Sequence, residues 1–115
     1  MISAKYRFHG YGSLNYLHRN GQTARGKMIA ARFAPNTRRS QPRFAVIVSK
    51  KVYKSAVKRN RIRRRIYEII RPHIAADSPT IDIAINVYSP EVLNLPPAEL
   101  KKQIEYLLKA ANFIR

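Results

Sequence analysis

Hydrophobic and polar residues recur along the chain with two periods, and together they predict six elements of secondary structure. Ile81, Ile83, Ile85 and Val87 alternate with polar or small residues, which is typical of a strand with one buried face. A longer stripe recurs at helical spacing near the end of the chain, over Leu100, Ile104, Leu107, Leu108 and Ala111. In chain order we expect a short helix over 14–20, strands over 27–34 and 43–49, a helix from Ser55 to Arg71, a strand over 81–88 and a helix over 95–113.

Local signals set the ends of these elements. Ser13 is a candidate cap for the first helix, which Gly21 would end. Pro72 ends the basic helix, because a proline disfavours helical geometry in the residue before it. Pro97 suits the first turn of the last helix.

This order of elements predicts an α/β (α+β) two-layer sandwich formed by one domain over residues 1–115. We expect a mostly antiparallel central sheet of about four strands with the helices packed on it; the pattern locates three of the strands. The segment from the 43–49 strand through the basic helix to the 81–88 strand is a β-α-β crossover. The general rule predicts a right-handed connection there.

The net charge of the chain and its uneven distribution indicate the kind of partner that the protein binds. The 115 residues include 23 Lys or Arg and 6 Asp or Glu, for a net charge of +17. Residues 1–71 hold nineteen of the cations and a single carboxylate, whereas residues 72–115 are almost neutral. So much like charge repels itself in the compact state, and a polyanion such as nucleic acid is the expected partner. The neutral last third would then act as scaffold.

The basic residues concentrate on one amphipathic element. Between residues 50 and 65 there are nine cations and no acid. Ile62, Ile66, Ile69 and Ile70 fall on one side of a helical wheel and predict the core-facing stripe. Arginines suit phosphate because a guanidinium binds it through two hydrogen bonds. The pattern therefore favours binding to phosphates held in a fixed arrangement over a diffuse attraction to negative charge.

Several other classes of function are disfavoured by the composition. The chain has no Cys, so disulfides, zinc–thiolate sites and thiol nucleophiles are excluded. The six acids are scattered, whereas metal-dependent phosphodiester cleavage needs clustered carboxylates, so we expect no catalytic residue. No signal peptide or membrane-spanning run is seen, so we expect a cytoplasmic protein. DNA binding, a nuclear-localisation role for the basic run and attachment to an anionic membrane surface stay as alternatives.

The stretch "VSKKVYKSAVKRNRIRRRIYE" resembles the signature of the bacterial ribonuclease P protein component, with Ser-Lys-Lys after an apolar strand and Arg-Asn-Arg in the following helix. The resemblance implies that the crossover is left-handed, against the general rule. It also implies a protein subunit that binds a catalytic RNA and assists Mg²⁺-dependent removal of the 5′ leader from precursor tRNA. By this resemblance, the candidate residues for binding the RNA subunit are Lys50, Lys51, Lys54, Lys58, Arg59, Asn60, Arg61, Arg63 and Arg64. No obligate protein partner or membrane is expected. A small ribosomal protein would share the same electrostatics and is the main rival.

The resemblance further implies a cleft for the single-stranded leader between the first helix and the sheet. Aromatic residues common on the first helix of the family are replaced here by Leu14 and His18, and Arg32 replaces another on the first strand. Aromatic side chains are the usual platforms for unpaired bases. The candidate leader contacts are therefore Tyr16, Phe33, Phe44 and Arg32.

Overall fold

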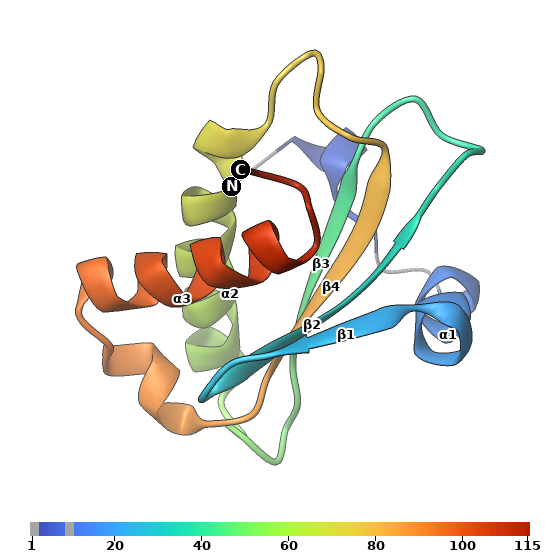
Figure 1. The fold of residues 1–115 in the computed structure, drawn as a ribbon. Coiled ribbons are helices and arrows are strands. Elements are labelled where there is room, and N and C mark those ends of the chain that lie inside the picture. Colours follow the sequence, from blue (N-terminus) through green and yellow to red (C-terminus); the bar gives the residue numbers. More distant parts are fainter. Residues whose placement is uncertain (1–2, 9–10) are drawn as a thin grey trace.

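The computed structural model of the chain describes residues 3–8 and 11–115, which form one sheet with helices on both of its faces (Figure 1). The three α-helices and four strands are α1 (Tyr11–Asn20), β1 (Gln22–Arg25), β2 (Ile29–Pro35), β3 (Arg43–Val48), α2 (Ala56–Ile70), β4 (Ile81–Val87) and α3 (Pro97–Ala110). Short 3₁₀ turns precede α1, follow α2 and lead into α3, at Ala4–Tyr6, Arg71–His73 and Pro90–Asn94. No described helix is both long and apolar enough to cross a membrane.

The sheet has the strand order β1-β2-β4-β3. β1 and β2, and β2 and β4, pair antiparallel, whereas β3 and β4 pair parallel. The α/β sandwich with a mostly antiparallel sheet of four strands is therefore confirmed, and the sheet is mixed because α2 connects two parallel neighbours. This connection is the predicted β-α-β crossover.

The first strand, Gln22–Arg25, was absent from the predicted elements. Its residues, Gln-Thr-Ala-Arg, include no large hydrophobic side chain, and it lies at the edge of the sheet with three of its four positions exposed. An edge strand with so little buried surface carries no hydrophobic period. Its position is fixed instead by backbone pairing with β2, from Gln22 opposite Phe33 to Arg25 opposite Ala30.

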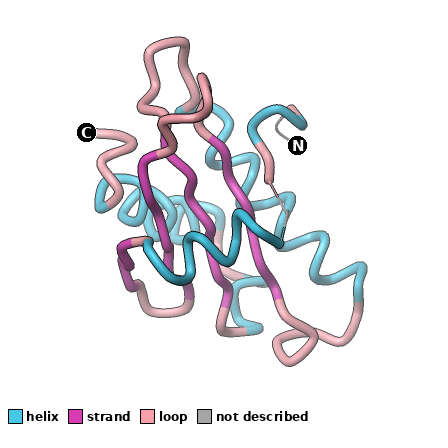
Figure 2. Tube along the Cα trace, turned by 90° about the vertical axis from the view of Figure 1, so that its right-hand side faces the viewer, coloured by secondary structure: helices cyan, strands magenta, loops and turns pink. Residues whose placement is uncertain are grey.

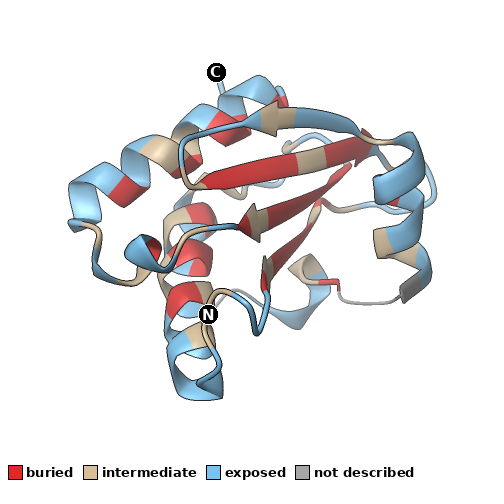
Figure 3. Ribbon diagram, turned by 90° about the horizontal axis from the view of Figure 1, so that it is seen from below, coloured by how far each residue is buried: buried red, intermediate tan, exposed pale blue. Residues whose placement is uncertain are grey.

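The two faces of the sheet carry different cores. Helices α2 and α3 cover one face, and the main core lies between them and the sheet (Figures 1 and 3). Ile83, Ile85, Ile104 and Leu107 in this core have no exposed surface. Helix α1 crosses the opposite face (Figure 2), where Leu17 packs on small side chains such as Ala45 and Ala84. These alanines let α1 approach the strands closely.

The helix ends agree with the sequence except at the start of α1; α2 ends at Ile70, two residues before Pro72, and α3 begins at Pro97. Ser55 caps α2, because its hydroxyl accepts a hydrogen bond from the Lys58 amide at 3.3 Å. Gly21 follows α1, and a Cβ there would lie 2.6 Å from the Leu17 carbonyl oxygen, so no other residue fits without movement. The prediction that Ser13 caps α1 is wrong, because the helix begins at Tyr11 and Ser13 lies in its first turn.

Candidate nucleic-acid interface

Helix α2 is amphipathic, with its buried side set by the isoleucines predicted from the sequence. Ile62, Ile66 and Ile70 are fully buried against the sheet and α3, whereas Ile69 is only half-buried. Tyr67, which the wheel did not assign to the core, is 6% exposed. Burial raises the pKa of Tyr67, and its hydrogen bond to the Val46 backbone and the nearby positive charges oppose that shift only in part. The buried side fixes which cations face outward.

The outward side of α2 presents unneutralised positive charge. Lys58, Asn60, Arg61 and Arg64 are exposed. Across the described residues, no carboxylate forms an ion pair with any of the nine cations between positions 50 and 65; the ion pair on this helix joins Arg71 to Glu68. Such a surface attracts phosphate in proportion to the counterions that binding would release.

Lysines at the β3–α2 junction extend this charged surface. Lys50, Lys51 and Lys54 are exposed on the turn that leads into α2. Arg59 holds the turn in place, because its Nη1 donates to the carbonyl oxygens of Tyr53 and Lys54 at 2.8 and 2.9 Å. Arg59 therefore uses Nη1 to bind the backbone, and this contact fixes the turn that carries Lys50, Lys51 and Lys54.

Asn60 and Arg63 connect the helix to the edge of the sheet. Arg63 Nη1 donates to Asn60 Oδ1 at 2.7 Å, and Arg63 Nε donates to the Val46 carbonyl oxygen at 3.3 Å. Val46 belongs to β3, an outer strand whose free carbonyls would otherwise be unpaired. The Asn of the Arg-Asn-Arg motif therefore orients an arginine over the strand edge, a role that the sequence did not reveal.

Arg65 is directed away from this surface. Its Nη1 donates to the carbonyl oxygens of Val92 and Leu93, each at 2.8 Å, and its Nη2 donates to Leu95. These carbonyls belong to the 3₁₀ turn before α3 and to Leu95, the residue that follows the turn. Arg65 is therefore a tie between α2 and the start of α3.

We use the name RNA-facing surface for the surface that the sequence predicts to bind RNA, which consists of the exposed cations of α2 and the junction, Asn60 and the two half-buried arginines Arg59 and Arg63. The structure brings together all the predicted candidates there: Lys50, Lys51, Lys54, Lys58, Arg59, Asn60, Arg61, Arg63 and Arg64.

Arg32, a predicted leader contact, caps the end of α1 in the structure. Its Nε donates to the Leu17 carbonyl oxygen at 3.0 Å, and its Nη2 donates to the carbonyl oxygens of His18 and Gly21, the latter at 3.1 Å. Its Nη1 donates to Thr23 Oγ1 at 2.8 Å. A cation at a helix C-terminus also interacts favourably with the helix dipole.

Phe33 and Phe44 lie on the wrong face of the sheet for a leader contact. Successive side chains of a strand point to opposite faces, and Phe33 follows Arg32, whose side chain reaches α1. Phe33 is 8% exposed and Phe44 has no exposed surface, and both belong to the main core beneath α2 and α3. Phe44 packs edge-to-face on Phe113 at 5.2 Å between ring centroids. The prediction of these two residues as base-stacking platforms is therefore wrong.

Tyr16 has the exposure that a stacking residue needs. Its side chain is 56% exposed on α1 and borders a groove of about 750 Å³. The loop after β2 supplies Arg38 and Arg39 to the same groove. A second hollow of about 250 Å³ lies on the α1 side of the sheet and is lined by residues that include Leu14, His18 and Asn86.

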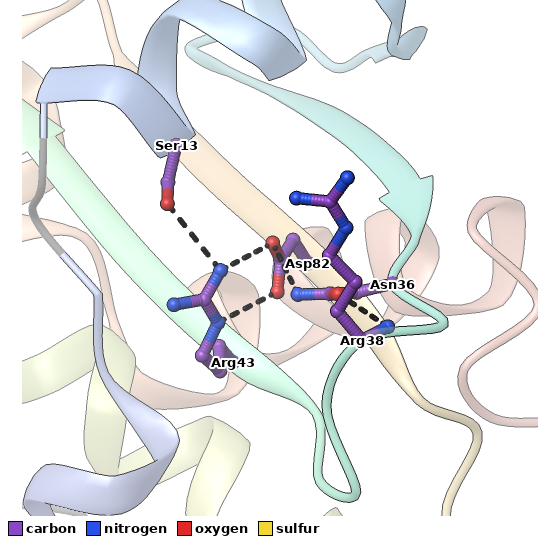
Figure 4. A network of polar contacts seen from close by, with 5 residues as sticks. All are labelled: Ser13, Asn36, Arg38, Arg43 and Asp82. Atoms are coloured by element: carbon purple, nitrogen blue, oxygen red, sulfur yellow. Dashed lines mark hydrogen bonds and ion pairs between the residues drawn. The ribbon is translucent and has the colours of Figure 1, made fainter.

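An ion pair between Arg43 and Asp82 lines the larger groove, and Figure 4 shows the polar contacts around it. Arg43 Nε and Nη2 donate to the two carboxylate oxygens of Asp82 at 3.0 and 2.7 Å. Asn36 Nδ2 donates to the same carboxylate at 3.0 Å, and Arg43 Nη2 reaches Ser13 Oγ at 3.4 Å. Asp82 neutralises Arg43, so the charge available to a ligand in this groove comes from Arg38 and Arg39.

Comparison with known proteins agrees with the resemblance noted in the basic stretch. A family model described as Ribonuclease P matches residues 2–112. The ribonuclease P protein component of Synechococcus sp. (strain RCC307) is 29% identical over 123 residues, covering 97% of this chain and 96% of that protein. The component from Chloroflexus aurantiacus (strain ATCC 29366 / DSM 635 / J-10-fl) is 30% identical over 106 residues, covering 92% of this chain and 77% of that protein.

Solved structures support the same fold. The RNase P protein of Staphylococcus aureus superposes with a TM-score of 0.83 at 22% identity, covering 96% of this chain and 98% of that chain. The RNase P protein of Thermotoga maritima gives a TM-score of 0.77 at 20% identity, covering 90% of this chain and 96% of that chain.

Proposed function

The chain belongs to the ribonuclease P protein family, and from this membership we propose that it binds the ribonuclease P RNA and the 5′ leader of precursor tRNA. The protein is a component of the ribonuclease P ribonucleoprotein, an endoribonuclease of tRNA processing. In this proposal the RNA subunit cleaves the phosphodiester bond, and the protein contributes binding and orientation.

The observation that carries the proposal is the unneutralised charge of the RNA-facing surface. Its eight cations have no acidic partner within the described part of the chain, and they lie on α2, which fully buried isoleucines anchor, or on the turn that leads into it. A rigid basic surface of this kind suits a folded RNA whose phosphates occupy fixed positions. Arg61 and Arg64 are the exposed arginines best placed for direct phosphate contacts.

We place the leader on the α1 side of the sheet. Tyr16 offers an exposed ring, and Arg38 and Arg39 add positive charge in the same groove, a combination typical of single-strand binding. Leu14 and His18 line the hollow beneath α1. Arg32 contributes by holding the end of α1, which positions these side chains.

Mg²⁺ in this proposal is held mainly by RNA. Within residues 3–8 and 11–115, no three His, Asp or Glu side chains lie together. Mg²⁺ usually keeps several waters and binds one or two carboxylates together with phosphates, so RNA phosphates suit it as the main ligands.

Cleavage of a precursor tRNA by a bacterial ribonuclease P RNA at low Mg²⁺ concentration tests the proposal. Addition of the protein should restore cutting at the mature 5′ end, and Arg61→Ala with Arg64→Ala should weaken that effect. Lys101→Ala is a matched control, because Lys101 is an exposed cation on α3, outside the RNA-facing surface. A protein that bound the RNA without ever restoring cleavage would instead be a basic RNA-binding protein of another kind, such as a small ribosomal protein.

Tyr16→Ala tests the position of the leader. Loss of one stacked base costs about 1–3 kcal/mol, so affinity for a precursor with its leader should fall by that amount. Affinity for the same tRNA without a leader should not change. An equal loss for both substrates would place Tyr16 against the tRNA body and remove it from the leader site.

A further inference from the structure

A second basic and aromatic groove lies on the opposite side of the molecule from α1, between α3 and the turn that joins β1 to β2. Its volume is about 490 Å³. Arg25 and Lys27 line it from the turn, and Lys102, Gln103 and Tyr106 line it from α3. We call it the α3 groove. The sequence predicted that the nearly neutral last third of the chain is scaffold. The groove was missed because Arg25 and Lys27, which supply two of its cations, come from the first third of the chain.

Tyr106 gives the α3 groove an exposed aromatic surface. Its side chain is 57% exposed, and its hydroxyl has no hydrogen-bond partner in the described part of the chain. Lys102 precedes Tyr106 by four residues and therefore lies on the same side of the helix. An aromatic ring bordered by ammonium groups is a typical platform for an unpaired base and its phosphates.

The charge of the α3 groove is positive and unneutralised. Arg25, Lys27 and Lys102 form no ion pair with any carboxylate of the described residues. Glu99 is the acid on the groove wall, so three cations face one carboxylate. The groove therefore favours an anionic partner.

Gln103 adds an unsatisfied polar atom to the groove wall. Its Oε1 is buried and accepts no hydrogen bond from the described residues. A buried acceptor without a donor costs about 1–3 kcal/mol. A ligand with N–H groups at the edge of a ring would allow the amide to turn into the groove and recover that hydrogen bond.

The α3 groove is continuous with the RNA-facing surface along one end of the sheet. The Tyr88 amide donates to the Met28 carbonyl oxygen at 2.9 Å, which places the end of β4 against the β1–β2 turn. Val48 pairs with Val87, which places the start of the Lys50–Lys51 turn beside the same end of β4. Both turns lie in the lower part of Figure 1. Tyr88, 66% exposed, lies between them.

We propose that the α3 groove binds an unpaired nucleotide of an RNA that also contacts the RNA-facing surface. The base stacks on Tyr106, the amide of Gln103 turns to accept a hydrogen bond from the base edge, and Arg25, Lys27 and Lys102 hold the flanking phosphates. This inference rests on the proposed function for the class of partner. It adds a site on α3, on the opposite edge of the sheet from β3, and the nucleotide belongs either to the ribonuclease P RNA or to the precursor tRNA.

The test measures two dissociation constants with the full-length protein: for the ribonuclease P RNA alone, and for precursor tRNA with the assembled ribonucleoprotein. Tyr106→Ala should raise one of them roughly 5- to 150-fold, the loss expected for one stacked base. Tyr106→Phe, which keeps the ring, should stay close to wild type. The constant that changes identifies which RNA supplies the nucleotide.

The salt dependence gives a second readout with a matched control. Lys102→Ala should reduce the slope of log K against log salt by about 0.7, the contribution of one phosphate on a single strand. Lys101→Ala removes the same charge from the same helix outside the groove and should leave the slope unchanged.

Three outcomes separate this site from the proposed function. If Tyr106→Ala and Lys102→Ala bind both RNAs like wild type while Arg61→Ala weakens binding, the groove is not an RNA site and the proposed function stands. If Arg61→Ala also leaves both constants unchanged, the proposed function fails, and the inference fails with it. If Tyr106→Phe loses as much affinity as Tyr106→Ala, stacking is not the interaction and the assignment of Tyr106 is overturned.

Discussion

At the scale of single residues, the sequence cannot distinguish the arginines that bind backbone from those that are exposed. Arg32, Arg59, Arg63 and Arg65 donate to backbone carbonyl oxygens, whereas Arg61 and Arg64 are exposed. A guanidinium uses the same N–H donors for a carbonyl and for a phosphate. The difference arises only from which carbonyls the fold leaves unpaired nearby.

Arg32→Ala tests the structural role assigned to Arg32. The substitution removes the donors for three carbonyl oxygens at the end of α1, so we expect the free energy of unfolding to fall by about 1–3 kcal/mol. Chemical denaturation with a circular-dichroism readout measures this change. Arg38→Ala removes an exposed cation from a loop and should leave stability nearly unchanged. Equal effects from the two substitutions would argue against the capping role.

Tyr67→Phe tests the raised pKa of the buried phenol. The unfolded chain should release this proton near pH 10, whereas burial delays its release in the folded protein. The protonated Tyr67 phenol therefore contributes fully to the free energy of unfolding below about pH 10, and this contribution is lost as the pH rises through the higher pKa of the folded state. In denaturation experiments above pH 10, wild type should lose stability more steeply than Tyr67→Phe. Parallel curves would mean that the Tyr67 hydroxyl ionises equally in both states.

At the scale of elements, the hydrophobic period predicted the helices and strands whose positions are set by burial of apolar side chains. It missed the strand whose position is set by backbone pairing alone. The stripes of α2 and α3 and the alternation of β4 correspond to buried faces because burial of apolar side chains places them. β1 was missed because a polar edge strand has no such stripe. The start of α1 was misplaced because no strong hydrophobic stripe precedes Leu14.

The exposed arginines on the outward face of α2 allow a quantitative prediction of how RNA binding depends on salt concentration. Removing two exposed phosphate contacts with Arg61→Ala and Arg64→Ala should reduce the slope of log K against log salt by about 1.4–1.8, because each phosphate contributes about 0.7–0.9. Stability should change little, since neither arginine contacts the core. Titration of the ribonuclease P RNA at several salt concentrations provides the slope. An unchanged slope would place the RNA on another surface.

At the scale of the whole molecule, the distribution of charge along the chain could be read from the sequence. Of the basic surfaces that this charge forms after folding, only one could be predicted. The grouping of the basic residues 50–64 on one surface was predictable because they are adjacent in the sequence. The α3 groove combines Arg25 and Lys27 with side chains some 75 residues later, and such a contact exists only after folding. The pattern of small hydrophobic residues on the α1 face did not predict the groove beside Tyr16 or the hollow beneath α1. In the sequence, alanines at these positions cannot be distinguished from alanines of an ordinary core.

The excess charge also links stability to the partner across the whole fold. A net charge of +17 destabilises the compact state, so a bound polyanion should raise the melting temperature. At a ligand concentration of 100 times Kd the gain is about 2.7 kcal/mol. Micromolar inorganic polyphosphate should therefore raise the melting temperature by several degrees in low salt, and added NaCl should abolish the rise because it screens the contacts. Arg61→Ala with Arg64→Ala should show a smaller rise. A melting temperature insensitive to polyphosphate would mean that the fold tolerates its own repulsion without a polyanion, and that the exposed cations of α2 face solvent alone.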